Sequence, residues 1–249
     1  MTNASVPVVH EVAIIDELGR QKTTFIPGER SLTIYLDKRE VVLVESAEDI
    51  ESIQVDWETD SAAVKTRRST VDIDAITSKR VVTTGCGQGT MFGGLMEDMA
   101  QIRLPEGPKL QQAAIVDLLE QIRAHETIYK KAGSVHACAV FERIGGDRVR
   151  LLHLIEDVGR HNAVDSISGL LWLAKRRGED LIFFTTGRLT SEMVIKGAQM
   201  GIPFLLTRSG VTQMGLELAK KTHLTLLSRC SGKHFEIYNA PERVVFQTP

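Results

Sequence analysis

The feature that most constrains the fold is an alternation of apolar strand-like runs with amphipathic helical segments between residues 134 and 240. The runs "DLIFFTTG", "IPFLLTRSG" and "LTLLSRC" are separated by "LTSEMVIKGAQMG" and "VTQMGLELAKKTH", where apolar residues recur at a helical period. Strands joined through helices form a parallel sheet, because each helix carries the chain back across a face of the sheet. The pattern therefore predicts a layered α/β domain with a parallel portion.

Two neighbouring segments extend this domain. "SVHACAVFERIGGDRVRLLHLIED" (134–157) indicates a β-hairpin that turns at Gly145 and Gly146, so the sheet is predicted to be mixed. "RHNAVDSISGLLWLAKRRG" (160–178) indicates a helix. Upstream, "LQQAAIVDLLEQIRAHETIYKKAG" (110–133) is expected to form one helix that stops at Gly133.

The N-terminal third has a different character. The short β-like runs "SLTIYLD" (31–37) and "EVVLVE" (40–45) precede a polar segment over residues 45–69. A chain of 249 residues has room for one large domain and a smaller appendage. We predict a small β-rich subdomain over residues 1–75 and an α/β domain over residues 76–249.

Composition and charge exclude several classes of protein. The net charge of −2 gives no overall basic field, so nucleic acid is not an expected partner. No apolar run approaches the roughly 20 residues that span a bilayer, and the N-terminus lacks the pattern of a signal peptide. Three cysteines spaced far apart give no disulfide framework. We expect a cytoplasmic protein with reduced thiols and no membrane partner.

Basic residues follow each strand predicted to end at the ligand-binding edge of the sheet. Ligands of α/β sheets bind beyond the carboxyl ends of the strands, and arginines with backbone N–H groups suit phosphates there. The basic residues in these turns are Arg160, Arg188, Arg208, Arg229 and Lys233. The sequence thus predicts a site for a polyanionic ligand.

The stretch "EDVGRHNAVD" (156–165) is the densest polar group at this edge. One interpretation is helix capping by Asp157 or Asn162, with an ion pair to Arg160. The other is a ligand site that includes Asp157, Arg160 and His161, since polar groups gathered at the mouth of an apolar sheet often mark one.

Cys86, in "TTGCGQGT", is the best candidate for a reactive thiol, because the surrounding glycines leave little cover around the sulfur. A turn without chemistry and a phosphate-binding turn are the alternatives. Cys138, beside His136 in "HAC", is expected in the core, and zinc is not expected because the chain has no C-x-x-C motif. Cys230 either has a pKa lowered by Arg229 and Lys233 or faces the core.

Taken together, "TTGCG", "SVHACAVF", "EDVGRHNAVD", "TTGRLTSEMVIKGAQMGIPFLLTRSGVTQMGLELAKKTHLTLL" and "FEIYNAPERV" resemble the FdhD/NarQ family of formate dehydrogenase accessory sulfurtransferases. The resemblance covers residues 81–245. It implies a three-layer, cytidine-deaminase-like α/β/α sandwich with a mixed sheet and without the deaminase zinc. It also implies a homodimer.

The resemblance further implies an activity. Cys86 would carry persulfide sulfur from a cysteine desulfurase to the molybdenum (or tungsten) bis-molybdopterin guanine dinucleotide cofactor, which the formate dehydrogenase catalytic subunit requires. The segment that would hold this cofactor is Arg229, Cys230, Ser231, Gly232, Lys233 and His234, joined by the strand-end residues named above. Gly89 stands where the family usually has a second cysteine, so a relay would use one thiol of this loop.

Three hypotheses follow. The first is a sulfur carrier that forms a persulfide on Cys86. The second is a chaperone that holds the guanine-dinucleotide cofactor without covalent sulfur chemistry, which Gly89 favours. The third is a deaminase-like hydrolase acting on a nucleotide.

Overall fold

The structure, a computed structural model, describes residues 9–15, 21–27, 33–36, 47–59, 61–67, 102, 104–105, 107–125 and 127–246. The described residues up to 67 belong to one compact unit and those from 102 onward to another. The predicted domain boundary near residue 75, the thiol of Cys86 and Gly89 all lie outside the described residues. The two-domain division with that boundary therefore stays a prediction.

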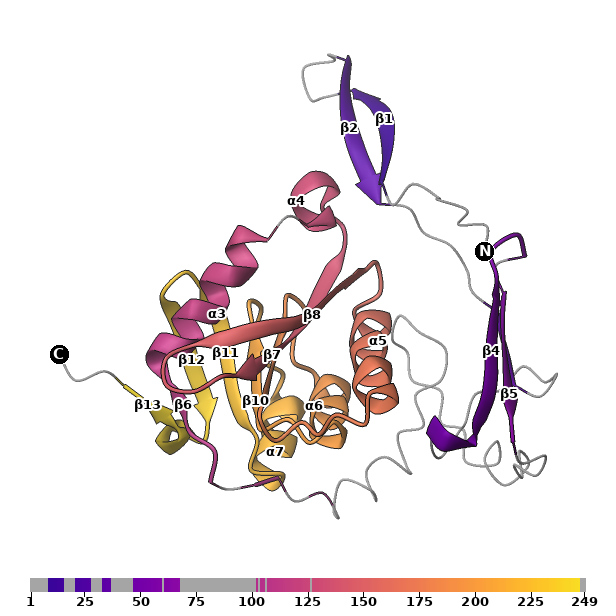
Figure 1. The fold of residues 1–249 in the computed structure, drawn as a ribbon. Helices are drawn as coiled ribbons and strands as arrows, with labels where there is room; N and C mark the ends of the chain where they lie inside the picture. The colour runs from indigo at the N-terminus through magenta and orange to yellow at the C-terminus, as the bar shows by residue number, and fades with distance from the viewer. Residues whose placement is uncertain are drawn as a thin grey trace. The chain divides into compact units, whose positions relative to one another are not determined.

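A six-stranded mixed sheet forms the centre of the C-terminal unit, with the strand order β12-β11-β10-β9-β7-β8 (Figure 1). Strands β9, β10 and β11 are parallel, whereas β7 is antiparallel to both β8 and β9, and β12 is antiparallel to β11. The strands are β7 (His136–Arg143), β8 (Val149–Asp157), β9 (Leu181–Thr185), β10 (Phe204–Thr207), β11 (Thr225–Ser231) and β12 (His234–Asn239). The predicted mixed α/β class and the hairpin are confirmed.

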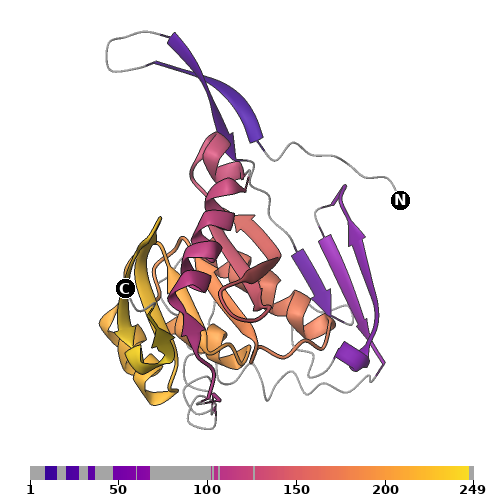
Figure 2. The ribbon, with the colours of Figure 1, turned by 60° about the vertical axis from the view of Figure 1, so that its left-hand side comes forward.

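Helices cover both faces of this sheet. Helix α3 (Gln112–Ala124) lies across one face, as Figure 2 shows in magenta, and the other face carries α5 (Arg160–Leu173), α6 (Ser191–Gln199) and α7 (Gln213–Lys221). Alternate residues of β7 join the two cores: Cys138 and Val140 pack with α5–α7, and Ala139 and Phe141 with α3. The unit thus has three layers. Kinship with cytidine deaminases in particular stays a prediction.

The strand directions bring the predicted ligand-binding turns to one edge. Because β7 is antiparallel to β8 and β9, the start of β7 lies beside the ends of these strands. His136 accordingly pairs with Asp157, and Cys138 with Thr185. We call this the carboxyl edge of the sheet, and the opposite end the amino edge.

The single helix predicted over residues 110–133 is wrong, because the chain forms two helices there. Helix α3 ends at Ala124, and α4 (Ile128–Ala132) is separate. Thr127 caps the new helix, since its hydroxyl oxygen accepts the N–H of Lys130 at 3.2 Å. Gly133 ends α4 with a positive φ of 63°, as expected of a stop glycine. Two more residues of the predicted helix form β6 (Leu110–Gln111), which pairs with β13 (Val244–Val245). The 3-10 turn Pro241–Arg243 directly precedes β13.

The described residues of the N-terminal unit are mainly strands, as expected. β1 (Val9–Ile15) and β2 (Gln21–Pro27) form a hairpin, and β3 (Thr33–Leu36), β5 (Ser61–Thr66) and β4 (Ile50–Asp56) form a sheet in that order, preceded by the 3-10 turn Ala47–Asp49. Strands β4 and β5 come from the segment that the sequence marked only as polar. Most of β4 is exposed, so its sequence shows little of the apolar alternation that reveals a half-buried strand.

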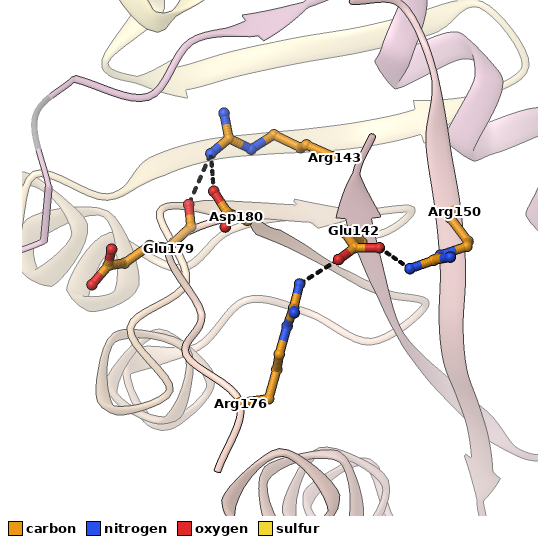
Figure 3. Close-up of polar contacts among 6 residues, drawn as sticks. All are labelled: Glu142, Arg143, Arg150, Arg176, Glu179 and Asp180. Atoms are coloured by element: carbon orange, nitrogen blue, oxygen red, sulfur yellow. Dashed lines mark hydrogen bonds and ion pairs between the residues drawn. The ribbon is translucent and has the colours of Figure 1, made fainter. Parts of the chain in front are cut away.

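The amino edge of the sheet is tied by ion pairs (Figure 3). Glu142 of β7 accepts hydrogen bonds from Arg150 of β8 and from Arg176, which follows α5. These bonds join β7 and the edge strand β8 to the segment that follows α5.

Arg143, the next residue of β7, is surrounded by acceptors. Its guanidinium donates to the carbonyls of Lys109 at 3.2 Å and Glu179 at 2.9 Å, and lies 3.5 Å from a carboxylate oxygen of Asp180. It also lies over the ring of Phe204, with 5.5 Å between the guanidinium carbon and the ring centroid. Burial lowers the pKa of Arg143. The arginine is therefore a structural element of this edge.

Across the described ranges, no helix combines the length and the apolar character needed to cross a membrane.

Candidate functional site

The sheet divides the side chains of the carboxyl edge into two groups. Successive residues of a strand point to opposite faces, so His136 lies on the face of Cys138 and α5, and Ala137 on the face of α3. Glu156 and Arg208 lie on the α3 side with Ala137. The predicted ligand contacts therefore do not form one continuous surface.

A pocket of about 300 Å³ opens on the α3 side, between α3, α4 and the ends of the strands. We call it the edge pocket. Its floor is apolar, with Leu119, Ile122 and Phe184, and three cations line it: Arg123, Lys130 and Arg208. An apolar floor with a few charged groups is the usual composition of a small-molecule site. Of the predicted contacts, Arg208, Cys230, Ser231 and Gly232 line this pocket.

Helix α4 forms one wall of the edge pocket. Glu156, at the end of β8, holds it by accepting the N–H groups of Ile128 at 2.6 Å and Tyr129 at 3.1 Å. The Arg208 guanidinium lies over the ring of Tyr129, 5.8 Å from its centroid. An exposed aromatic ring beside a cation can hold both a base and a phosphate of a nucleotide.

Sequence reasoning missed Tyr129 and Glu156 as site residues. The continuous helix predicted over residues 110–133 places Tyr129 near its end, where nothing in the sequence distinguishes it. The usable signal was Thr127, an N-cap residue that begins a second helix three positions before Lys130. Its recognition would have placed the start of α4, and with it Tyr129, beside the strand ends.

The segment from Arg229 to His234 contributes only in part to the pocket. Arg229 has a positive φ of 54°, at a shift of register between β11 and β12, and its side chain lies beside Gly210. Lys233, on the following turn, and His234, the first residue of β12, are exposed. None of these three residues lines the edge pocket, so their roles as ligand contacts stay predictions.

The α5 side of the edge carries a different group, formed by His136, Arg160 and Arg188, which we call the basic cluster. Burial lowers the pKa of His136, and the positive charges of Arg160, Arg188 and His161 lower it further. His161 itself lies 2.9 Å from a carboxylate oxygen of Glu192, with both side chains largely buried.

Asp157 is used locally, but the predicted helix capping by Asp157 or Asn162 is wrong, because Gly159 is the N-cap of α5 and no side chain caps this helix. Its carboxylate accepts the N–H of Gly159 at 2.6 Å and the amide of Asn162 at 3.1 Å. The proposed ion pair to Arg160 is not among the interactions of the described residues. The carboxylate of Asp157 therefore stabilises the turn before α5.

Two of the three thiols are almost fully buried. Cys138 and Cys230 are 0% and 1% exposed, and burial raises the pKa of each to about 12. The prediction that Cys138 is a core residue is confirmed, and Cys230 faces the core rather than having a lowered pKa. The described residues contain no group of three or more His, Cys, Asp or Glu side chains placed to hold a metal ion.

The fold and the site define a class: a three-layer α/β protein with a cation-lined pocket at the carboxyl edge of a mixed sheet. The FdhD/NarQ family model matches residues 29–245, so the chain belongs to the FdhD/NarQ family.

Individual relatives agree with this assignment. The sulfur carrier protein FdhD of Saccharolobus solfataricus is 36% identical over 137 residues, 55% of this chain and 52% of that protein. The protein of the same name from Listeria monocytogenes is 25% identical over 242 residues, 88% of this chain and 91% of its own length. The chain spans about half the length of the first curated relatives it matches, 52% in each case.

A solved structure shares the fold. The crystal structure of a protein assigned as a formate dehydrogenase accessory protein from Desulfotalea psychrophila superposes with a TM-score of 0.72 at 24% identity. The match covers 96% of this chain and 99% of that one. It supports the arrangement of strands and helices described above.

Proposed function

We propose that this protein is a sulfur carrier. Cys86 accepts persulfide sulfur from a cysteine desulfurase and passes it to the molybdenum (or tungsten) bis-molybdopterin guanine dinucleotide cofactor, which it carries as cargo for formate dehydrogenase. The names of its relatives, sulfur carrier protein and formate dehydrogenase accessory protein, support this proposal. The proposal includes a homodimer that works in the cytoplasm.

The observation that carries the proposal is the burial of two of the three thiols. The thiolate is the nucleophile in sulfur transfer, and a thiol with a pKa of about 12 has almost no thiolate at neutral pH. Cys138 and Cys230 are therefore unsuitable as sulfur carriers. Since the chain has only three cysteines, Cys86 is the remaining candidate.

The chemistry balances with one thiol. The Cys86 thiolate attacks the outer sulfur of the desulfurase persulfide, so an S–S bond forms on Cys86 while the donor's S–S bond breaks and its cysteine leaves as a thiolate. In the second step the outer sulfur leaves Cys86, which returns to a thiolate. Two electrons from a reduced metal centre of the cargo convert this sulfur to sulfide.

The edge pocket is proposed to hold a guanine nucleotide part of the cargo. Tyr129 offers an aromatic face for the base, and Arg208 and Lys130 offer charge for phosphates. The hydroxyl of Ser231 and the backbone at Gly232 line the same pocket. Polar and aromatic groups thus surround an apolar floor in the way that a nucleotide requires.

The decisive experiment is sulfur loading. The protein is incubated with a cysteine desulfurase and cysteine, and intact mass after labelling of free thiols reports the added sulfur. The parent and Cys230→Ala should gain one sulfur atom, whereas Cys86→Ala should gain none. If Cys86→Ala takes up sulfur as readily as the parent, the carrier role of Cys86 is wrong.

A second candidate is a chaperone that binds the cofactor without covalent chemistry. It is favoured by Gly89, which removes the neighbouring thiol of the loop, together with the burial of Cys138 and Cys230. The two functions differ in one result. A Cys86→Ser variant that still activates formate dehydrogenase fully would establish the chaperone and exclude the carrier.

A further inference from the structure

We propose that the basic cluster of His136, Arg160 and Arg188 is a second binding site, specific for a phosphate-type oxyanion and separate from the edge pocket. This inference does not depend on sulfur chemistry. It rests on the geometry around Gly187, on the charges at the cluster and on its position across the sheet from the pocket.

Gly187 makes the cluster possible. A Cβ atom at this position would lie 3.3 Å from Cδ of Arg160 and 3.5 Å from Nδ1 of His136. The side-chain stem of Arg160 and the imidazole of His136 therefore pack against the same stretch of backbone, and a side chain at position 187 would have to displace them by a few tenths of an ångström. The close approach brings together residues from β7, from the start of α5 and from the turn after β9.

The peptide at Gly187 is held rigidly by two buried threonines. Its N–H donates to the hydroxyl of Thr185 at 3.1 Å, and its carbonyl accepts the hydroxyl of Thr207 at 2.5 Å. Both hydroxyls belong to central strands of the sheet, and both side chains are fully buried. The position of the cluster is thus set by the core before any ligand arrives, as a binding site requires.

No described residue forms an ion pair with the two arginines of the cluster. Within the described parts of the chain, neither Arg160 nor Arg188 has an ion pair or a hydrogen bond, and Nε of Arg160 is shielded from solvent without an acceptor. The acids nearby are used elsewhere: Asp157 by Gly159 and Asn162, and Glu192 by His161. A shielded donor without an acceptor is costly, so an anion would stabilise this arrangement.

The donors are of the kind that binds a tetrahedral oxyanion. Each guanidinium group presents a planar pair of N–H donors, and such a pair can bind two oxygens of one phosphate at once. Arg160 is also the first residue of α5, a helix of 14 residues whose positive end lies at the cluster. An imidazole completes the set on the side of β7.

The cluster is independent of the edge pocket because the sheet lies between them. His136 is on the face of Cys138, whereas Ala137 lines the pocket on the opposite face. The oxyanion has two chemical sources: a free inorganic anion, or the diphosphate of a nucleotide that reaches over the strand ends from the pocket. The test separates these sources.

Isothermal titration of the full chain with inorganic pyrophosphate tests the site. Arg160→Gln and Arg188→Gln should each weaken pyrophosphate binding by about tenfold or more, since each removes charge-assisted hydrogen bonds. Arg208→Gln, in the edge pocket, should leave it unchanged. Arg177→Gln is the charge control, because its side chain is 88% exposed and distant from the edge by sequence and by strand position. Gly187→Ala should weaken binding without removing a charge.

Titration with GDP then identifies the source. If GDP affinity falls in Arg208→Gln but not in Arg160→Gln, the cluster takes a free anion; if it falls in both, the cluster takes the nucleotide's own diphosphate. Either pattern supports an anion site, and circular dichroism checks that each variant is folded. The proposal is overturned if pyrophosphate does not bind, if Arg160→Gln and Arg188→Gln bind it like the parent or like Arg177→Gln, or if Gly187→Ala leaves the affinity unchanged.

Discussion

The amino and carboxyl edges of the same sheet surround their arginines with different partners. At the amino edge, Arg143 has two carbonyls and a carboxylate, and Arg150 and Arg176 share Glu142. At the carboxyl edge, Arg160 and Arg188 have no such partner in the described part of the chain. Arginines whose guanidinium groups already pair with protein acceptors hold the strands together, although Nε of Arg143 has no partner, whereas arginines without such pairs are available to a ligand.

The largest effect on stability is expected at the amino edge. Arg143→Met keeps packing against Phe204 but leaves the carbonyls of Lys109 and Glu179 without their donor. The free energy of unfolding should fall by about 1–3 kcal/mol. Urea denaturation measures this change, with Arg177→Gln as the exposed control. An unchanged stability in Arg143→Met would show that the paired arginine does not hold the edge.

A smaller effect is expected for an arginine of the carboxyl edge. Arg188→Gln removes an exposed charge that has no partner among the described residues, so stability should change by no more than about 0.5 kcal/mol. The same variant should lose pyrophosphate binding. If urea denaturation gives Arg188→Gln the same loss of unfolding free energy as Arg143→Met, the proposed difference between the two edges is wrong.

The smallest and most specific effect concerns acid. Burial raises the pKa of Glu142, but the hydrogen bonds and charges of Arg150 and Arg176 outweigh it, so the pKa lies below its ordinary value of 4.5. Because the folded pKa is the lower one, this carboxylate stabilises the protein fully above the unfolded value, and the contribution disappears as the pH falls through the folded value. The stability difference between the parent and Glu142→Gln should thus be constant near neutral pH and shrink below about pH 4. Urea denaturation at several pH values measures it, and a difference that grows in acid would contradict the assignment.

Local patterns were sufficient to predict the layers of the C-terminal unit. The apolar runs that became β9, β10 and β11 and the helices between them are encoded by residues close in sequence, so strand ends and their basic turns could be located. The family resemblance implied a mixed α/β sheet as well, and the family itself is confirmed by the match over residues 29–245.

The division of the site between two faces could not be predicted. Which face a side chain takes depends on the strand register, and the sheet has register shifts at Val140/Phe141 and at Ser228/Ser231. The wall formed by Tyr129 depends on Glu156, which lies 27 residues away in sequence. The periodicity of apolar residues contains no information on such long-range contacts. The sequence predicts one helix that includes Tyr129 and a hairpin that ends near Glu156, and it gives no sign that the two residues meet.

The amide between Thr207 and Arg208, at the carboxyl end of β10, links the two faces. Thr207 holds the carbonyl of Gly187 on one side, and the next residue, Arg208, lines the pocket on the other while its N–H donates to the carbonyl of Thr185 at 3.0 Å. The two residues share a planar and rigid amide. A rotation of this amide would consequently move the Thr207 hydroxyl on one face and the Arg208 side chain on the other at the same time. A change of backbone at this point therefore alters both the basic cluster and the edge pocket.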